Sequence, residues 1–354
     1  MTTSLPREDL KKARLDAGPM VVAKILVNAF STTARQRDPP SPNKTIPIRL
    51  VTIGVSHYCE KVRWALDIIE SRSDNPYYYT EEAHPPGFHA FSTLELSKGE
   101  ASVTPMTTLE ENGVRQLLWQ SNAILKRFLP ELYPTEIEKE VEVMEADFGK
   151  RVGATVRCFC YHYMIADGYS KATTQMCANP NHVTKIEHLL FGKMLDHGLN
   201  VGIRKAVGVK AETAAASIPA LRAVFAEVSK RLEESDGDYI LDVKDKSYGF
   251  TAADLTFAAL ASPLLFPSEL ETWLVPRDQL PKEINHLAYE LMDTTAGKHA
   301  LKIYKQHRCV KGEQVVAMKN VDRNKYPWQG LGLGWYAFLS GLAVAVGVVG
   351  ARRR

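Results

Sequence analysis

The chain has 354 residues, which allows one large domain or two modest ones with a sizeable core. Hydrophobic residues make up 45% and charged residues 24%, the usual balance of a folded globular protein. The net charge of +3 is too small to predict binding to nucleic acid. The five cysteines are odd in number and scattered, so we expect free thiols in a reducing compartment rather than a disulfide framework.

Residues 1–45 are predicted to form a flexible N-terminal arm. Arg35–Lys44 is polar and rich in proline, which is typical of a linker. Basic residues and serines leave a transit peptide as an alternative, but Glu8, Asp9 and Asp16 count against it. We therefore expect an arm that is flexible or lies on a surface.

Residues 46–130 are predicted to form an α/β unit. Ile46–Gly54 is short and β-branched, as in a buried strand, and the following EKVRWALDIIE places its apolar residues on one helical face. A second strand is expected at Tyr77–Thr80, and Asn112-Gly113 predicts a hairpin between two more strands. A helix then begins at Ser121. The order strand, helix, strand, loop, hairpin, helix indicates a thioredoxin-like layer.

Residues 135–309 are predicted to form an all-helical domain. Thr251 and Asp254 have the spacing of a capping box, and the apolar LTFAALA after them fits a central core helix, so we assign Asp254 a structural role. Cys158, Cys160 and His162 suggest a metal site at first sight, but Cys160 would point away from the other two on a helix. We expect packing there and no bound metal.

Residues 331–351 form a run of 21 residues without a charge. A helix that crosses a hydrocarbon core of ~30 Å needs about 20 such residues. A buried core helix is the alternative, but the last helix of a globular domain is rarely apolar on every face. We therefore predict a single transmembrane helix after a linker at residues 310–330.

The position of this helix predicts where the protein lies. No signal peptide is evident at the N-terminus, so the helix is expected to be a C-terminal tail anchor with the bulk of the chain facing the cytosol. Its glycines and alanines and the final arginines favour a mitochondrial, peroxisomal or plastid outer membrane over the membranes of the secretory pathway.

Several motifs, taken in order, resemble the glutathione transferase family. The strand followed by SHYCEKVRWALD, then Thr104-Pro105 before the hairpin, then WQSNAILKRF are similar to its N-terminal domain. Three later segments are similar to helices of its C-terminal domain: EADFGKRVGATVRCFCYHYMIAD, GFTAADLTFAAL and DTTAGKHALKIYKQHR. The resemblance covers about residues 46–308. It implies an α/β N-terminal thioredoxin-like domain plus an all-α C-terminal domain, followed here by the single transmembrane helix.

The resemblance also implies a serine-type site that binds glutathione. Ser56 matches the serine that donates a hydrogen bond to the glutathione sulfur, and a plain helix N-cap is the alternative. Pro105 matches the family's cis-proline, and Thr104 before it would hydrogen-bond the cysteinyl backbone. Gln120 and Ser121 match the pair that holds the γ-glutamyl group, at a helix start suited to a carboxylate.

Cys59 lies three residues after Ser56, in the second place of a CxxC redox pair. The first place is serine, which disfavours dithiol chemistry because that chemistry needs both sulfurs. We expect Cys59 to be a half-buried structural thiol. A redox thiol that forms mixed disulfides is the alternative.

Together these features predict a membrane-tethered enzyme that conjugates glutathione, as co-substrate, to hydrophobic electrophiles held between the two halves. One alternative is a noncatalytic transferase-like protein that binds ligands or organises membranes. Another is a glutathione-dependent thiol reductase that uses Cys59. The expected partners are glutathione, a small hydrophobic electrophile and membrane lipid. A homodimer is left open.

Overall fold

The computed structural model describes residues 33–37, 42–165, 168–196, 203–204, 208–308 and 313–317. Within these ranges, no helix is both long and apolar enough to cross a membrane. The predicted transmembrane helix at residues 331–351 lies outside them, as do most of the predicted N-terminal arm and most of the predicted linker.

Four adjacent strands of one mixed sheet follow the chain order predicted for a thioredoxin-like layer. They are Ile46–Ile53 (β2), Tyr77–His84 (β3), Met106–Glu111 (β4) and Val114–Trp119 (β5). Strand β2 is parallel to β3, and β4 is antiparallel to both β2 and β5. In the hairpin between β4 and β5, Asn112 and Gly113 have φ of 52° and 74°, as the predicted tight turn requires.

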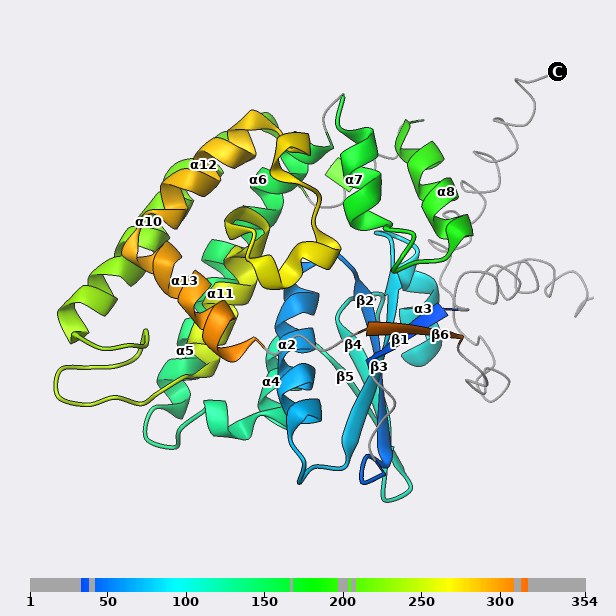
Figure 1. Ribbon diagram of the computed structural model, residues 1–354, viewed down its shortest axis with the longest axis horizontal. Coiled ribbons are helices and arrows are strands. Elements are labelled where there is room, and N and C mark those ends of the chain that lie inside the picture. The colour runs from blue at the N-terminus through cyan, green and yellow to red at the C-terminus, as the bar shows by residue number, and fades with distance from the viewer. Residues whose placement is uncertain are drawn as a thin grey trace, which may run out of the picture.

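Two further strands extend this sheet beyond β3. They are Thr33–Arg37 (β1) and Glu313–Ala317 (β6), and the complete order is β5-β4-β2-β3-β1-β6. Strand β1 is antiparallel to both β3 and β6. Segments from the ranges predicted as a flexible arm and a linker therefore lie side by side at one edge of the sheet (Figure 1). The TARQR segment lacks the apolar alternation that would have predicted a strand.

Helices cover both faces of the sheet. Helices α2 (His57–Ser71) and α4 (Ser121–Phe128) lie on the face turned toward the helical half, and α3 (His89–Leu96) lies on the other face (Figure 1). Helix α2 is buried on nearly every side because the sheet packs on one side of it and α11 (Ala252–Leu265) on the other. Its predicted apolar face is confirmed, and five of its charged side chains are buried as well: Glu60, Lys61, Arg63, Asp67 and Glu70.

The second half of the described chain is helical, as predicted. Apart from α11, the α-helices described in this half are α5 (Glu138–Phe148), α6 (Ala154–Met164), α7 (Ser170–Cys177), α8 (Lys185–Met194), α10 (Ala211–Ser235), α12 (Lys282–Met292) and α13 (Thr295–His307). Helix α11 is central and starts with the predicted capping box. The Thr251 N–H donates to the Asp254 carboxylate at 3.0 Å, and that carboxylate also accepts the Ile240 N–H at 2.9 Å. Asp254 is therefore structural.

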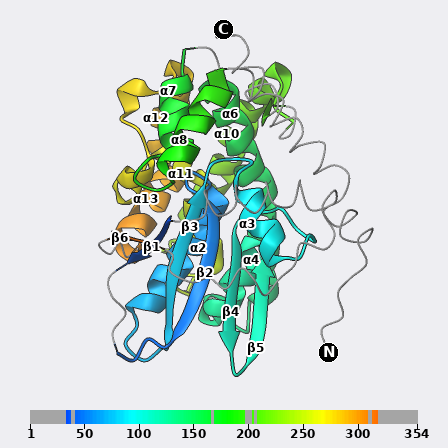
Figure 2. The same ribbon diagram turned by 90° about the vertical axis from the view of Figure 1, so that its right-hand side faces the viewer.

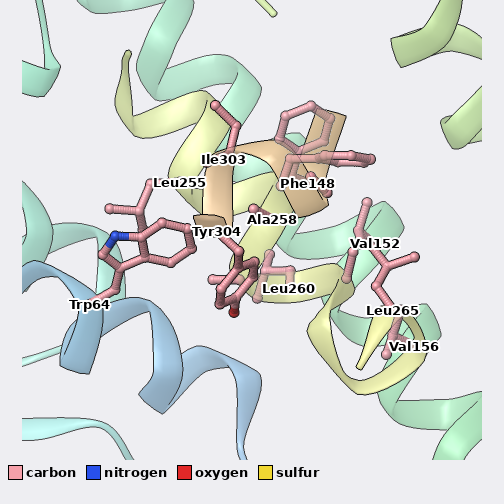
Figure 3. Packing of buried hydrophobic residues seen from close by; sticks show 14 of the residues in the cluster. Trp64, Phe148, Val152, Val156, Leu255, Ala258, Leu260, Leu265, Ile303 and Tyr304 are labelled. Atoms are coloured by element: carbon pink, nitrogen blue, oxygen red, sulfur yellow. The ribbon is translucent and has the colours of Figure 1, made fainter. Parts of the chain in front are cut away.

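The two halves share one hydrophobic core. Trp64 of α2 points toward Leu255 of α11 and Tyr304 of α13, with the Trp64 and Tyr304 ring centroids 4.5 Å apart (Figure 3). The Trp64 indole N–H donates to the His307 carbonyl at 2.9 Å. The boundary near residue 130 therefore marks a change of secondary structure and not a gap between two cores.

Candidate active site

The segments that carry the predicted site residues meet at one end of the sheet. Val51 of β2 pairs with Met106 of β4, and Met106 pairs with Trp119 of β5. The predicted residues flank these pairs along the chain: Ser56 follows β2, Thr104-Pro105 precedes β4, and Gln120-Ser121 follows β5. The register of three strands thus brings together positions far apart in the sequence.

Ser56 lies where β2 turns into α2. Its N–H donates to the Ile53 carbonyl at 3.0 Å, and its backbone is extended, with φ −71° and ψ 120°, as at an N-cap. The Ser56 Oγ accepts the Cys59 N–H at a long 3.4 Å. The hydroxyl proton can rotate toward another acceptor, because a serine hydroxyl both accepts and donates. Ser56 therefore combines a capping role with a hydroxyl donor at a helix N-terminus.

A cavity of about 1130 Å³ opens beside Ser56, between the two halves. The end of the sheet and α3 form one side of it, and α6, α7, α8 and α12 form the other. Figures 1 and 2 show α7 and α8 above this end of the sheet. The volume lies at or above the upper end of the ~300–1,000 Å³ typical of small-molecule sites, so it has room for more than one ligand.

Thr104 and Ser56 converge on this cavity. Both line it, and the Thr104–Pro105 peptide bond is cis, as predicted. Pro105 is buried behind Thr104. The Ser56 and Thr104 hydroxyls both act on the Cys59 thiol, and each lowers its pKa in part. The two side chains therefore approach a common point.

Cys59 is fully buried, whereas a half-buried thiol was predicted. The prediction was wrong because α2 is enclosed on both sides. Burial raises the pKa of the Cys59 thiol, and the nearby Arg63 charge and Ser56 hydroxyl only partly oppose this. A protonated thiol without access to solvent is a poor nucleophile. The geometry therefore disfavours redox chemistry at Cys59.

Gln120 and Ser121 share this end of the sheet but do not line the cavity. Gln120 is exposed and has φ 82°, and Ser121 is buried, with its hydroxyl donating to Asn122 Oδ1 at 3.4 Å. The first backbone N–H groups of a helix have no intrahelical acceptor. No side chain caps α4, so none accepts from these groups at its start. The binding of a γ-glutamyl group here stays a prediction.

The cavity wall includes the first turn of α2, which the sequence interpretation missed. The Tyr58 hydroxyl donates to the Gly149 carbonyl at 2.7 Å, and the His57 ring lies 3.0 Å from the Gly153 carbonyl. Both carbonyls belong to the π-helical turn between α5 and α6. A Cβ at Gly153 would lie 2.4 Å from the Tyr58 hydroxyl oxygen, so only glycine allows this approach.

Arg157 of α6 supplies the charge on the wall. Burial and the Arg157 charge lower the pKa of His57 to about 3, and burial with the His84 charge lowers the pKa of His89 to about 4. Both imidazoles are therefore neutral at pH 7, whereas a guanidinium stays protonated. The helical spacing of Arg157, Tyr161 and Met164, all of which line the cavity, is the signal that could have identified this wall.

No known family model matches the sequence, and no curated protein matches it significantly. Similar solved structures include β-etherase LigF from Sphingobium sp. strain SYK-6, with 17% identity, TM-score 0.39 and coverage of 72% of this chain and 98% of that one. Maleylacetoacetate isomerase from Anaeromyxobacter dehalogenans 2CP-1, with bound glutathione, has 15% identity, TM-score 0.33 and coverage of 75% and 100%. A glutathione S-transferase from Pseudomonas fluorescens has 12% identity, TM-score 0.39 and coverage of 74% and 97%.

A buried polar cluster of Glu82, His84, Ser92 and Glu187 has the composition of a Ser-His-acid triad. The Ser92 hydroxyl lies 3.1 Å from His84 Nε2, and His84 Nδ1 lies 2.5 Å from Glu187. Burial alone would lower the pKa of His84, but the carboxylates of Glu187 and Glu82 raise it to about 10. A protonated imidazole cannot accept the serine proton, and all four side chains are buried. The cluster therefore holds β3, α3 and α8 together.

Cys158, Cys160 and His162 lie on α6. Among the residues that the structure describes, no three histidine, cysteine, aspartate or glutamate side chains gather as metal ligands. Burial raises the pKa of the Cys160 thiol to about 12, which keeps it protonated. Cys160 instead forms part of the cavity wall.

Proposed function

We propose that this protein is a glutathione transferase-like enzyme, tethered to a membrane by its C-terminal tail, that conjugates glutathione to apolar electrophiles. The observation that carries the proposal is the position of Ser56. Its hydroxyl lies at the N-terminus of α2 and faces a large cavity with mainly apolar walls, beside Thr104 and the cis peptide bond.

The proposed chemistry uses this position directly. A free thiol has a pKa of ~8.5, and a helix N-terminus with a hydrogen-bond donor lowers it. In the proposal, Ser56 donates to the glutathione sulfur and the thiol proton leaves to solvent. The thiolate attacks the electrophilic carbon to form a C–S bond, the bond from that carbon to its leaving group breaks, and the leaving group departs to solvent with the electron pair. Thr104 would hold the cysteinyl backbone. Gln120, Ser121 and the uncapped start of α4 would hold the γ-glutamyl group.

Replacing Ser56 with alanine is expected to lower kcat/KM for glutathione conjugation by about tenfold to a hundredfold, the usual effect of losing a hydrogen bond to a charged group. The assay follows conjugation of an aromatic halide by absorbance. The matched control is Thr294→Ala, which removes an N-cap whose Oγ1 accepts the Gly297 N–H at 3.0 Å. Thr294 does not line the cavity. Both variants should lose about 1 kcal/mol of stability, but only Ser56→Ala should lose activity.

Three results would distinguish the alternatives. Absence of glutathione binding to the parent chain would favour a noncatalytic protein. Activity that survives Ser56→Ala but is lost in Cys59→Ser would indicate thiol reductase chemistry. Equal loss of activity in Ser56→Ala and Thr294→Ala would mean that Ser56 acts only as a cap.

We also propose that residues 331–351 anchor the protein, with its bulk facing the cytosol, in an outer membrane of mitochondria, peroxisomes or plastids. Strand β6 ends at Ala317, and residues 318–330 can span at most about 45 Å, so the edge of the sheet formed by β6 would stay near the membrane. The full chain should remain in the membrane pellet after alkaline carbonate extraction, and a chain ending at residue 330 should be released. Retention of the shortened chain would reject the anchor.

A further inference from the structure

The charge on the cavity wall is one-sided. Arg157 is the one permanently charged side chain that lines the cavity in the described part of the chain, and no described aspartate or glutamate lines it. His57 and His89, which also line it, are uncharged at pH 7 because burial lowers the pKa of each. The cavity therefore presents a single positive charge.

Arg157 also differs from the arginine nearest to it along the chain. Arg151 pairs with Asp147 at 3.0 Å and with Glu227 at 2.8 Å. Among the described residues, no carboxylate forms an ion pair with Arg157, whose guanidinium carbon lies 6.0 Å from the centre of the Tyr58 ring. Arg157 is half-buried, so water reaches it only in part. A guanidinium in this setting is suited to a planar anion from outside the chain.

The rest of the wall is mainly apolar. On the side of the helical half it is formed by side chains of α6, α7, α8 and α12, including Met164, Met176, Phe191, Met194 and Ile284. Methionines adapt to ligands of irregular shape. The ligand that matches such a wall has an apolar body and one anionic group.

We infer that the second substrate of this cavity is an apolar carboxylic acid, whose carboxylate pairs with Arg157 while its body lies against α7 and α8. The inference rests on the proposed transferase function for the reaction, but the binding of the acid does not depend on it. In that reaction, the glutathione thiolate forms a C–S bond with the ring carbon of an aryl chloride acid. The C–Cl bond breaks, chloride leaves with the electron pair, and the thiol proton passes to solvent.

Two probes of nearly equal shape test the charge requirement in the full chain: 4-chloro-3-nitrobenzoate and 4-chloro-3-nitrobenzamide. Calorimetry without glutathione should show that the benzoate binds about tenfold to a hundredfold more tightly than the amide. Arg157→Gln should bring the two affinities within about twofold. Arg151→Gln should keep the preference of the parent.

Turnover with glutathione provides the second readout. A preference for the benzoate in binding but no conjugation of either probe would support the anion site and reject the transferase function. Equal binding of the two probes to the parent would overturn the inference. It would also be overturned if Arg157→Gln weakened glutathione binding and left the preference for the acid unchanged, since Arg157 would then serve glutathione.

Discussion

Replacing Lys61 with methionine is expected to lower the free energy of unfolding by about 3–5 kcal/mol, the cost of leaving a buried charge without its partner. The Lys61 ammonium of α2 pairs with Glu145 of α5 and donates to Asn122 Oδ1 at 2.9 Å. Both charged side chains are buried. Methionine fills a similar volume, so the loss reports the charge and not a cavity. Urea unfolding followed by tryptophan fluorescence measures it, because Trp64 lies in the shared core.

A matched control separates burial from charge. Lys126 pairs with Glu138 at 2.6 Å, but these side chains are 42% and 44% exposed. Lys126→Met should therefore change the free energy of unfolding by less than about 1 kcal/mol, as is usual for exposed pairs. In the double variant Lys61→Met with Glu145→Gln, much of the lost stability should return, because the uncompensated carboxylate is gone. A double variant as unstable as Lys61→Met would show that packing, and not the charge, sets the loss.

The buried charges of α2 illustrate what the sequence could not show. Its periodicity correctly predicts the apolar face of Val62, Ala65, Leu66 and Ile69. The polar face of an amphipathic helix is usually solvated, but Arg63 on that face donates to Glu81 of β3 at 2.7 Å. The partners of these charges lie on other elements, and no local pattern reveals such pairs. The exposure of Cys59 was predicted wrongly for the same reason, because its burial depends on the elements that pack around α2.

The predictable parts of the site are those fixed by local geometry. Ser56 as N-cap, the hairpin at Asn112-Gly113 and the capping box at Thr251 each depend on residues within a few positions of one another. The cis bond before Pro105 was predicted from the family resemblance, and the structure contains it. The wall of the cavity depends instead on how α6, α7 and α8 pack over the sheet. The sequence did not predict that Arg157 would reach the same space as Ser56.

The His84 cluster predicts a fall in stability at alkaline pH. His84 Nε2 lies 2.9 Å from Glu82, which also binds Arg49 at 2.6 Å, and His84 Nδ1 lies 2.5 Å from Glu187. The carboxylates outweigh burial, and the pKa of His84 is raised to about 10 from its usual value of 6.5. The folded state therefore keeps a proton that the unfolded chain releases near pH 6.5. The stabilisation is fully present below that pH and is lost as pH rises through about 10.

The expected measurement compares the parent with His84→Gln between pH 6 and 10.5. The difference in their free energies of unfolding should be several kcal/mol near pH 6 and should shrink steadily toward pH 10. His286→Gln is the control, because it replaces a histidine of α12 outside the cluster. A difference that does not change with pH would mean that His84 is neutral in the folded protein.

The same titration should reach the cavity. The Glu187 carboxylate accepts a hydrogen bond from His84 Nδ1 and also forms the capping box of α8 with Thr184. Phe191 and Met194 of α8 line the cavity. Deprotonation of His84 would leave Glu82 and Glu187 buried with only Arg49 to offset their charge. We therefore expect hydrogen exchange in α8 to rise between pH 8 and 10 beyond the intrinsic increase with pH, while exchange in α11 follows the intrinsic rate. Equal changes in α8 and α11 would indicate global unfolding, whereas a change confined to α8 would show that this buried imidazolium holds the cavity wall against the sheet.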